Sequence, residues 1–224
     1  SCSIPAGNAS ATRMARTRRV LPCSTREFLH VSSQVITDLQ DGVLYVRLNR
    51  PRAGNALTID MLSDLQRHLS KAQDDPRVLA AVLCATGDDF CRGIDLAEAF
   101  GMSSQTAEKI GFTPDVPAWR QFSRPKICAV EGATRGLGLS LVEASDICIS
   151  SDKATFQHDE LSLGICPAGG SFQNLPRLVG VRKATDMLLS GVALSAKEAL
   201  QFGLVSRLVP RGGALDAAKA DAAA

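Results

Sequence analysis

The sequence contains no long apolar run, no strong bias of charge and no C-x-x-C pair, and each absence argues against a class of protein. No stretch approaches the ~20 consecutive apolar residues of a membrane-spanning helix, so we expect no membrane span. The 25 basic and 23 acidic residues leave a net charge of +2, which is too balanced to predict a nucleic-acid partner. With 45% hydrophobic and 21% charged residues, the composition is that of an ordinary globular protein.

The seven cysteines are odd in number, and several lie in apolar runs such as Val82-Leu83-Cys84. This pattern predicts buried free thiols rather than disulfides. It favours a reducing compartment, which we expect to be the mitochondrial matrix or another reducing organelle, with the cytoplasm as the alternative. No group of His, Cys, Asp and Glu has the spacing of metal ligands, so we predict no metal.

The first acidic residue is Glu27, and four arginines precede it among Ser, Ala and Thr: Arg13, Arg16, Arg18 and Arg19. This composition is similar to an organelle transit segment, and a flexible basic tail is an equally good interpretation. We therefore assign residues 1–30 to a tail and residues 31–210 to one folded domain.

Apolar patterning predicts alternating strands and helices. We expect strands over 43–48, 78–84, 127–130 and 146–150, and helices that begin after Thr58, run over 181–189 and open at the capping box Ser195–Glu198. This alternation indicates an α/β domain. Residues 97–124 have weak periodicity and several Gly and Pro, so we expect partial helix and a loop that can cover a site.

Three ordered motifs carry a family resemblance. The first is NRPRAGNAL (49–57), the second is FCRGIDL (90–96), and the third runs from 124 to 164 around the turn Gly136-Leu137-Gly138. The run 188–210 adds to them. Each motif alone is a common turn pattern, but together, over residues 40–210, the ordered set resembles the crotonase superfamily of enoyl-CoA hydratases and isomerases.

The resemblance implies an α/β fold of the ClpP/crotonase type, a spiral of ββα units with surrounding helices that packs as a homotrimer or as paired trimers. It also implies an oxyanion hole in which the backbone N–H groups of Ile94 and Leu137 bind a thioester oxygen as it becomes negative. Gly93, Gly136 and Gly138 would let the backbone approach the ligand and turn tightly.

The same resemblance makes Glu160 the catalytic acid/base. Family hydratases carry a second glutamate at the position of Ser140, and Glu143, three residues further along the helix, would point away by most of a turn. A single carboxylate suits isomerisation of a double bond better than hydration. A hydratase that holds its water at Ser140 and a non-catalytic interaction module remain the alternatives. Neither His158 nor Asp159 aligns with a family catalyst, and we expect His158 to be half-buried.

A coenzyme A thioester is the substrate that the resemblance implies, without a separate cofactor. Besides the glycines of the oxyanion loops, the substrate-binding residues that we expect are Arg52, Ala53 and Gly54 near the adenine and phosphates, Cys91, Asp95 and Leu96 along the pantetheine, and Ser140 and Asp159. Arg52 could equally be a solvated charge on a loop. Residues 211–224 are fewer than the helical arm usual in the family, so we expect a short Ala-rich tail and a weakened trimer.

Overall fold

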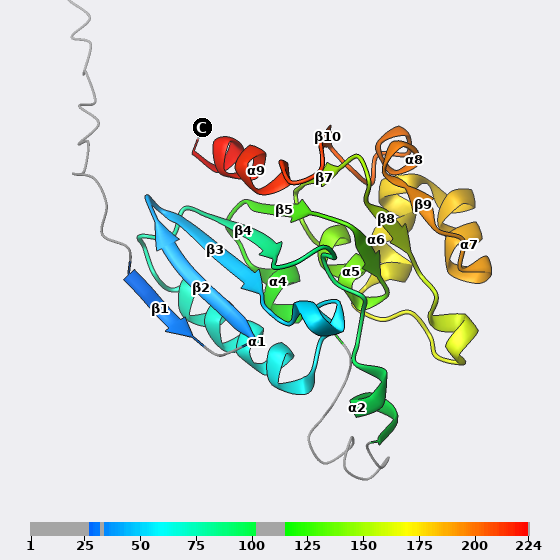
Figure 1. Cartoon of the computed structure of the whole chain (residues 1–224), viewed down its shortest axis with the longest axis horizontal. Helices are drawn as coiled ribbons and strands as arrows, with labels where there is room; N and C mark the ends of the chain where they lie inside the picture. The colour runs from blue at the N-terminus through cyan, green and yellow to red at the C-terminus, as the bar shows by residue number, and fades with distance from the viewer. Residues whose placement is uncertain (1–26, 32–33, 102–114, 224) are drawn as a thin grey trace, which may run out of the picture.

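The structure, a computed structural model, describes residues 27–31, 34–101 and 115–223. A seven-stranded sheet runs from edge to edge in the order β1 (Glu27–Val31), β2 (Val35–Gln40), β3 (Val43–Leu48), β4 (Ala80–Ala85), β5 (Lys126–Val130), β7 (Ile147–Ser151) and β10 (Arg207–Val209) (Figure 1). The first three strands pair antiparallel, and all pairs from β3 onward are parallel. β4 is buried along nearly its whole length, as its apolar sequence predicts for a strand covered on both faces.

A second sheet contains the short strands β6 (Ala133–Arg135), β8 (Thr155–Gln157) and β9 (Leu194–Ser195). The chain leaves β5 in the large sheet, adds β6 to the small one, and then forms helix α5 (Leu137–Glu143) before it returns as β7. β7 and β8 are again divided between the two sheets. This repeated strand–strand–helix path is the predicted spiral of ββα units.

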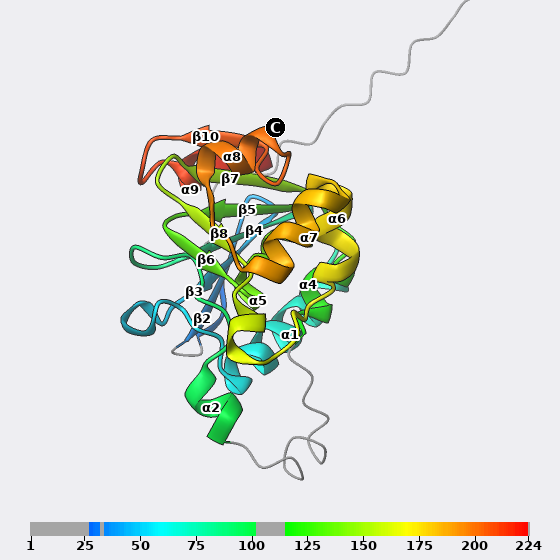
Figure 2. The ribbon, with the colours of Figure 1, turned by 90° about the vertical axis from the view of Figure 1, so that its right-hand side faces the viewer.

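The helices cover both faces of the large sheet. One side carries the main core and the helices α1 (Ile59–Gln73), α4 (Pro117–Gln121), α5 and α6 (Ser171–Val179), while α7 (Val181–Ser190) and α8 (Ala196–Gln201) lie next to the small sheet (Figure 2). α2 (Leu96–Gly101) projects from the body (Figure 1), and the described residues also contain two 3-10 turns, η1 (Pro51–Ala53) and η2 (Glu160–Leu163). None of the helices in the described ranges has the length and apolar content that a membrane crossing requires.

Both predicted helix starts are confirmed. Thr58 Oγ1 accepts a hydrogen bond from Met61 N at 3.1 Å, and Ser195 forms the reciprocal capping box with Glu198. The prediction of free thiols is confirmed for the buried cysteines Cys84, Cys91, Cys128 and Cys148, whereas Cys166 is free but exposed and Cys2 and Cys23 lie outside the described residues.

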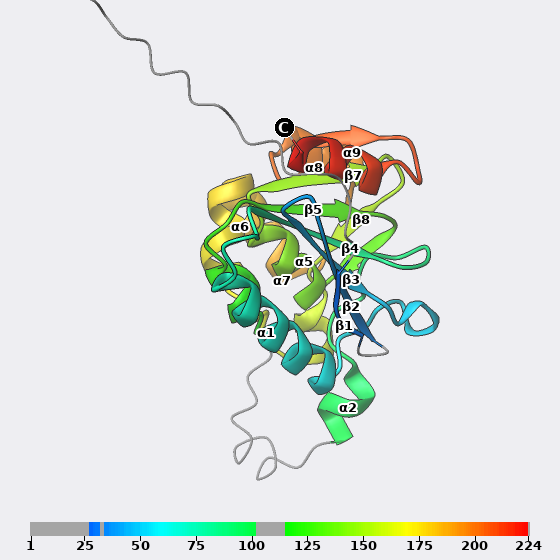
Figure 3. The same ribbon diagram turned by 90° about the vertical axis from the view of Figure 1, so that its left-hand side faces the viewer.

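The C-terminal residues differ from the prediction of a tail. Helix α9 (Ala214–Ala222) lies against β4, β5 and β7, on the face of the sheet opposite α1 (Figure 3). Ala214 and Ala218 are completely buried there in a cluster that includes Val82 and Ile149. Alanine lets a helix approach a sheet closely, so the composition that looks like a low-complexity tail is a packing face.

The N-terminal boundary also shifts. β1 begins at Glu27, inside the stretch that we assigned to the tail, and pairs with β2. Residues 1–26, with the four arginines of the transit-like segment, lie outside the described residues.

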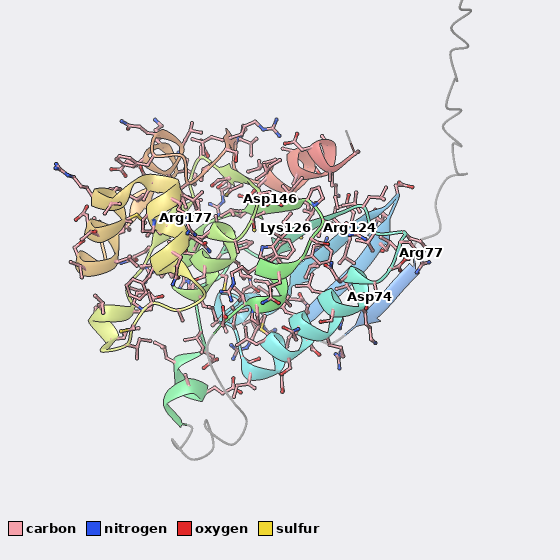
Figure 4. The ribbon with its side chains drawn as sticks, turned by 180° about the vertical axis from the view of Figure 1, so that it is seen from behind. Asp74, Arg77, Arg124, Lys126, Asp146 and Arg177 are labelled. Atoms are coloured by element: carbon pink, nitrogen blue, oxygen red, sulfur yellow. The ribbon has the colours of Figure 1, made fainter. Side chains whose placement is uncertain are left out.

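An ion pair ties the starts of two parallel strands together. Lys126 N donates to Asp146 Oδ2 at 2.7 Å, and Lys126 Nζ lies 3.2 Å from the Phe122 carbonyl oxygen and 3.4 Å from Asp146 (Figure 4). This contact aligns β5 with β7, and the loop that leaves the far end of β5 carries part of the candidate site.

Candidate active site

Backbone pairing brings the second and third motifs together. Cys91 N donates to the carbonyl of Ala133 at 3.2 Å, and Arg135 N donates to the carbonyl of Cys91 at 2.9 Å. On its other side, the second motif pairs with the end of the first motif, where Leu57 N donates a hydrogen bond to the Gly93 carbonyl at 2.8 Å. Segments about 40 residues apart in the chain therefore form one wall.

Two glycines make this wall possible. Gly93 has φ +92°, and a Cβ there would lie 3.2 Å from the carbonyl oxygen of Arg135. Gly136, at φ +47°, would place a Cβ 3.2 Å from Glu160 Oε1. Both backbone conformations are rare for residues with a side chain, and both positions have close neighbours, so only glycine lets the two loops and Glu160 approach one another.

The N–H groups of Ile94 and Leu137 donate no hydrogen bond to any residue in the described ranges. At Ile94, the bridge to Leu57 uses the carbonyl of Gly93 and the N–H of Asp95 instead. Leu137 is the first residue of α5, where an N–H has no acceptor within the helix. Two donors thus remain for a ligand.

These donors border a cavity of about 330 Å³. Its walls come from residues 92–94 and Leu96, residues 135–137 and parts of the segment 159–168. Ile94, Leu96 and Leu137 give it apolar surface, and Asp159 and Glu160 contribute carboxyl groups. An apolar cavity with a few polar groups near one another is the usual form of a small-molecule site.

Glu160 reaches this cavity while its side chain remains 9% exposed. Behind it lies His158, whose Nδ1 is 3.1 Å from both Glu160 oxygens and whose Nε2 is 2.7 Å from Glu143 Oε1. Burial lowers the pKa of His158, but hydrogen bonds to the two carboxylates and their negative charges outweigh this effect and raise the pKa to about 9. Asp159, by contrast, turns to Arg135, 3.3 Å away.

A family model described as enoyl-CoA hydratase/isomerase matches residues 38–223 of the chain. The chain belongs to this family. Among its relatives, a short-chain-enoyl-CoA hydratase from Clostridium acetobutylicum is 33% identical over 84% of this chain and 73% of its own length. A 2,3-dehydroadipyl-CoA hydratase from Escherichia coli is 36% identical over 80% of this chain and 70% of its own length.

Solved structures agree with the fold. An enoyl-CoA hydratase from Bacillus anthracis superposes with a TM-score of 0.77 at 31% identity, over 84% of this chain and 75% of that one. An enoyl-CoA hydratase from Mycobacterium avium gives 0.75 at 34% identity, over 85% and 79%. The predicted crotonase-like α/β fold is therefore confirmed.

Ser140, where the resemblance would place the second glutamate of a hydratase, does not line the cavity. Its hydroxyl is completely buried and bonds to Ser171 Oγ at 2.9 Å and to the carbonyl of Ala168 at 3.1 Å. A hydroxyl held in this way does not hold a water in the cavity, so the idea of a water bound by Ser140 does not fit the structure.

The other predicted substrate-binding residues divide into two groups. Gly93, Gly136, Leu96 and Asp159 line the cavity, whereas Arg52, Ala53, Gly54, Cys91, Asp95 and Gly138 do not. Asp95 accepts a hydrogen bond from the Glu98 N–H and forms an ion pair with Arg50 at 2.7 Å. Both contacts lower the pKa of Asp95, and the hydrogen bond from Glu98 has the larger effect.

Cys91 and Gly138 support the site from behind. A Cβ on Gly138 would lie 2.5 Å from the carbonyl oxygen of Cys91, so the two motifs pack backbone against backbone. Burial raises the pKa of the Cys91 thiol to about 12, which keeps it neutral and suits a packing role.

Three features of the site differ from what the sequence predicted. Arg92 and Arg135 both line the cavity, and His158 is completely buried rather than half-buried. Arg92 also lies against η1, because a Cβ on Gly54 would meet its side chain. The arginine within the FCRGIDL motif was a signal available in the sequence. Of the predicted covering segment, residues 102–114 lie outside the described residues.

Proposed function

We propose that the chain binds an acyl-CoA thioester and moves the double bond of an enoyl-CoA, with Glu160 as the single acid/base. The observation that supports this most is the combination of two unbonded N–H groups, at Ile94 and Leu137, with a buried carboxyl group in one apolar cavity. Membership of the enoyl-CoA hydratase/isomerase family supports the thioester as substrate.

In the proposed reaction, the carboxylate of Glu160 removes a proton from C2 of a 3-enoyl-CoA. The electrons of that C–H bond move into the thioester and place a negative charge on its oxygen, where the two N–H groups stabilise it. The same proton then returns to C4, which leaves the double bond between C2 and C3. No oxidant or metal is needed, and one carboxyl group acts first as base and then as acid.

Hydration is the second candidate, and two observations favour it. Asp159 places a second carboxyl group on the cavity wall, and the relatives described above are named as hydratases. Two carboxyl groups can divide the activation of a water and the delivery of a proton at C2. An argument against hydration is that the Asp159 carboxyl group forms an ion pair with Arg135.

The test compares Glu160→Gln with Asp159→Asn, each assayed with a 3-enoyl-CoA and with crotonyl-CoA. Isomerisation by Glu160 alone predicts loss of at least about 100-fold in turnover in Glu160→Gln, with acyl-CoA binding retained, and little change in Asp159→Asn. Formation of a 3-hydroxyacyl product that both substitutions abolish would instead favour hydration. Turnover that survives Glu160→Gln would contradict both.

A non-catalytic module is the remaining alternative, and the same preparations address it. Failure of the wild-type chain to bind any acyl-CoA, together with stable incorporation into a larger assembly, would favour it. The homotrimer and the reducing organelle stay proposals, which sedimentation of the purified chain and localisation of the tagged chain would test.

A further inference from the structure

Three ionisable side chains form a buried chain behind the cavity. Glu143 on α5, His158 after β8 and Glu160 on η2 are linked at 2.7 Å and 3.1 Å, and the side chains of Glu143 and His158 are completely buried. Glu143 Oε2 has no hydrogen-bond partner within the part of the chain that the structure describes. Neither Glu143 nor His158 lines the cavity, so the chemistry proposed above leaves both without a role.

The geometry places both ring nitrogens of His158 against carboxyl groups. Ionised carboxylates only accept hydrogen bonds, and a neutral imidazole has a single N–H. Each ring nitrogen of His158 lies against a different carboxyl group, so when both of these groups are ionised, both contacts are hydrogen bonds only if both nitrogens carry protons. A buried carboxylate without a cation is costly, and the imidazolium supplies that cation to two of them.

We propose that His158, held between Glu143 and Glu160, is a positioning residue that keeps the carboxyl group of Glu160 oriented toward the Ile94 and Leu137 N–H groups. This inference rests on the proposed function, because it assigns Glu160 the role of base.

The contacts explain how the orientation is held. Nδ1 of His158 is equally distant from both oxygens of Glu160, so it restrains rotation of the carboxyl group. On the opposite side, Glu160 Oε1 abuts Gly136, where a Cβ would be 3.2 Å away. A carboxylate fixed in this manner is already oriented to transfer a proton between C2 and C4 of the substrate. Displacement of such a catalytic group by about 1 Å can lower the rate about 100-fold.

The other charges near this chain are engaged elsewhere. Arg135 pairs with Asp159, Lys183 on α7 pairs with Asp186 at 3.0 Å, and Glu198 on α8 caps its own helix. Arg177 on α6 and the remaining basic side chains of α7 and α8, Arg182 and Lys197, are exposed. Within the described residues, the charges that act on His158 are therefore those of Glu143 and Glu160.

The test is the dependence of kcat/KM on pH, from about pH 6 to about pH 10, in the wild type, Glu143→Gln, Glu143→Asp and His158→Gln. We expect wild-type activity to fall above about pH 9, as His158 loses its proton. Glu143→Gln should lower the pH at which kcat/KM falls by about one unit or more, and Glu143→Asp should return this pH to the wild-type value. His158→Gln should lower kcat at least about tenfold with a smaller change in KM.

Titration of the His158 imidazole by NMR, assigned by the signal lost in His158→Gln, is a second readout that needs no turnover. Protonation that persists to about pH 9 in the wild type, and to a lower pH in Glu143→Gln, supports the charge network even if a variant is too unstable to assay. A neutral His158 at pH 7 overturns the inference. An active enzyme whose alkaline profile is the same in all four proteins overturns the positioning role alone, whereas a wild type inactive on every thioester overturns the proposed function with it.

Discussion

At the scale of single residues, His158 should make stability depend on pH. Its pKa is about 9 in the folded chain and 6.5 when unperturbed, so the folded state binds the proton more tightly. The resulting stabilisation is fully present below about pH 6.5 and is lost as pH rises through about 9, in total on the order of 3 kcal/mol. Denaturant unfolding at a series of pH values measures it.

His158→Gln is the matched variant for this measurement, because it keeps a side chain that can hydrogen-bond but removes the titration. The loss of stability between about pH 6.5 and about pH 9 should be smaller in this variant than in the wild type. Equal slopes in both proteins would show that folding does not raise the pKa of His158.

The residues of this network show what sequence can and cannot predict. The motifs placed Glu160, Ile94 and Leu137 beside one cavity, and the structure brings them there. Glu143 was set aside because its position on α5 turns it away from the ligand, which is correct for the cavity. The Glu143 side chain instead contacts His158. This contact could not be predicted from a helical or strand period, because the two residues are 15 positions apart and do not belong to the same element.

At the scale of elements, the capping box of α8 should contribute measurably to stability. Ser195 Oγ accepts from Glu198 N at 3.3 Å, and Ser195 N donates to Glu198 Oε2 at 2.8 Å. Ser195→Ala removes one of these bonds and should lower the free energy of unfolding by about 1 kcal/mol, with turnover unchanged. Lys197→Ala, two residues along on the exposed side, should change it by less than about 0.5 kcal/mol. Equal effects would contradict a capping role.

Elements with a strong local signal were predicted, and those without one were missed. Thr58 and the Ser195–Glu198 box mark helix starts by side-chain chemistry that acts within one turn. α6 contains Pro176 in its interior, which argues against a helix. β8 and β9, with three and two residues, are too short to show alternation, and they exist because the chain returns to pair with β6.

At the scale of the whole molecule, α9 decides whether one face of the large sheet is covered. The face beneath it is apolar, with Val43, Val82, Ile127 and Ile149 all nearly inaccessible to solvent. In the sequence, these C-terminal residues resemble a tail, because a run rich in alanine has no apolar pattern that reveals a buried side. Only the sheet defines which alanines face inward.

Ala218→Asp should therefore detach α9 from the sheet. The substitution places a charge among apolar side chains, so we expect a loss of at least about 3 kcal/mol in the free energy of unfolding. Ala220→Asp makes the same chemical change on the exposed side of the same helix and should stay within about 0.5 kcal/mol of the wild type. Because an uncovered apolar sheet face associates with other surfaces, Ala218→Asp should also self-associate in sedimentation velocity. If both variants unfold alike, α9 is not the cover of this face, and the apolar residues beneath it must be protected by other means.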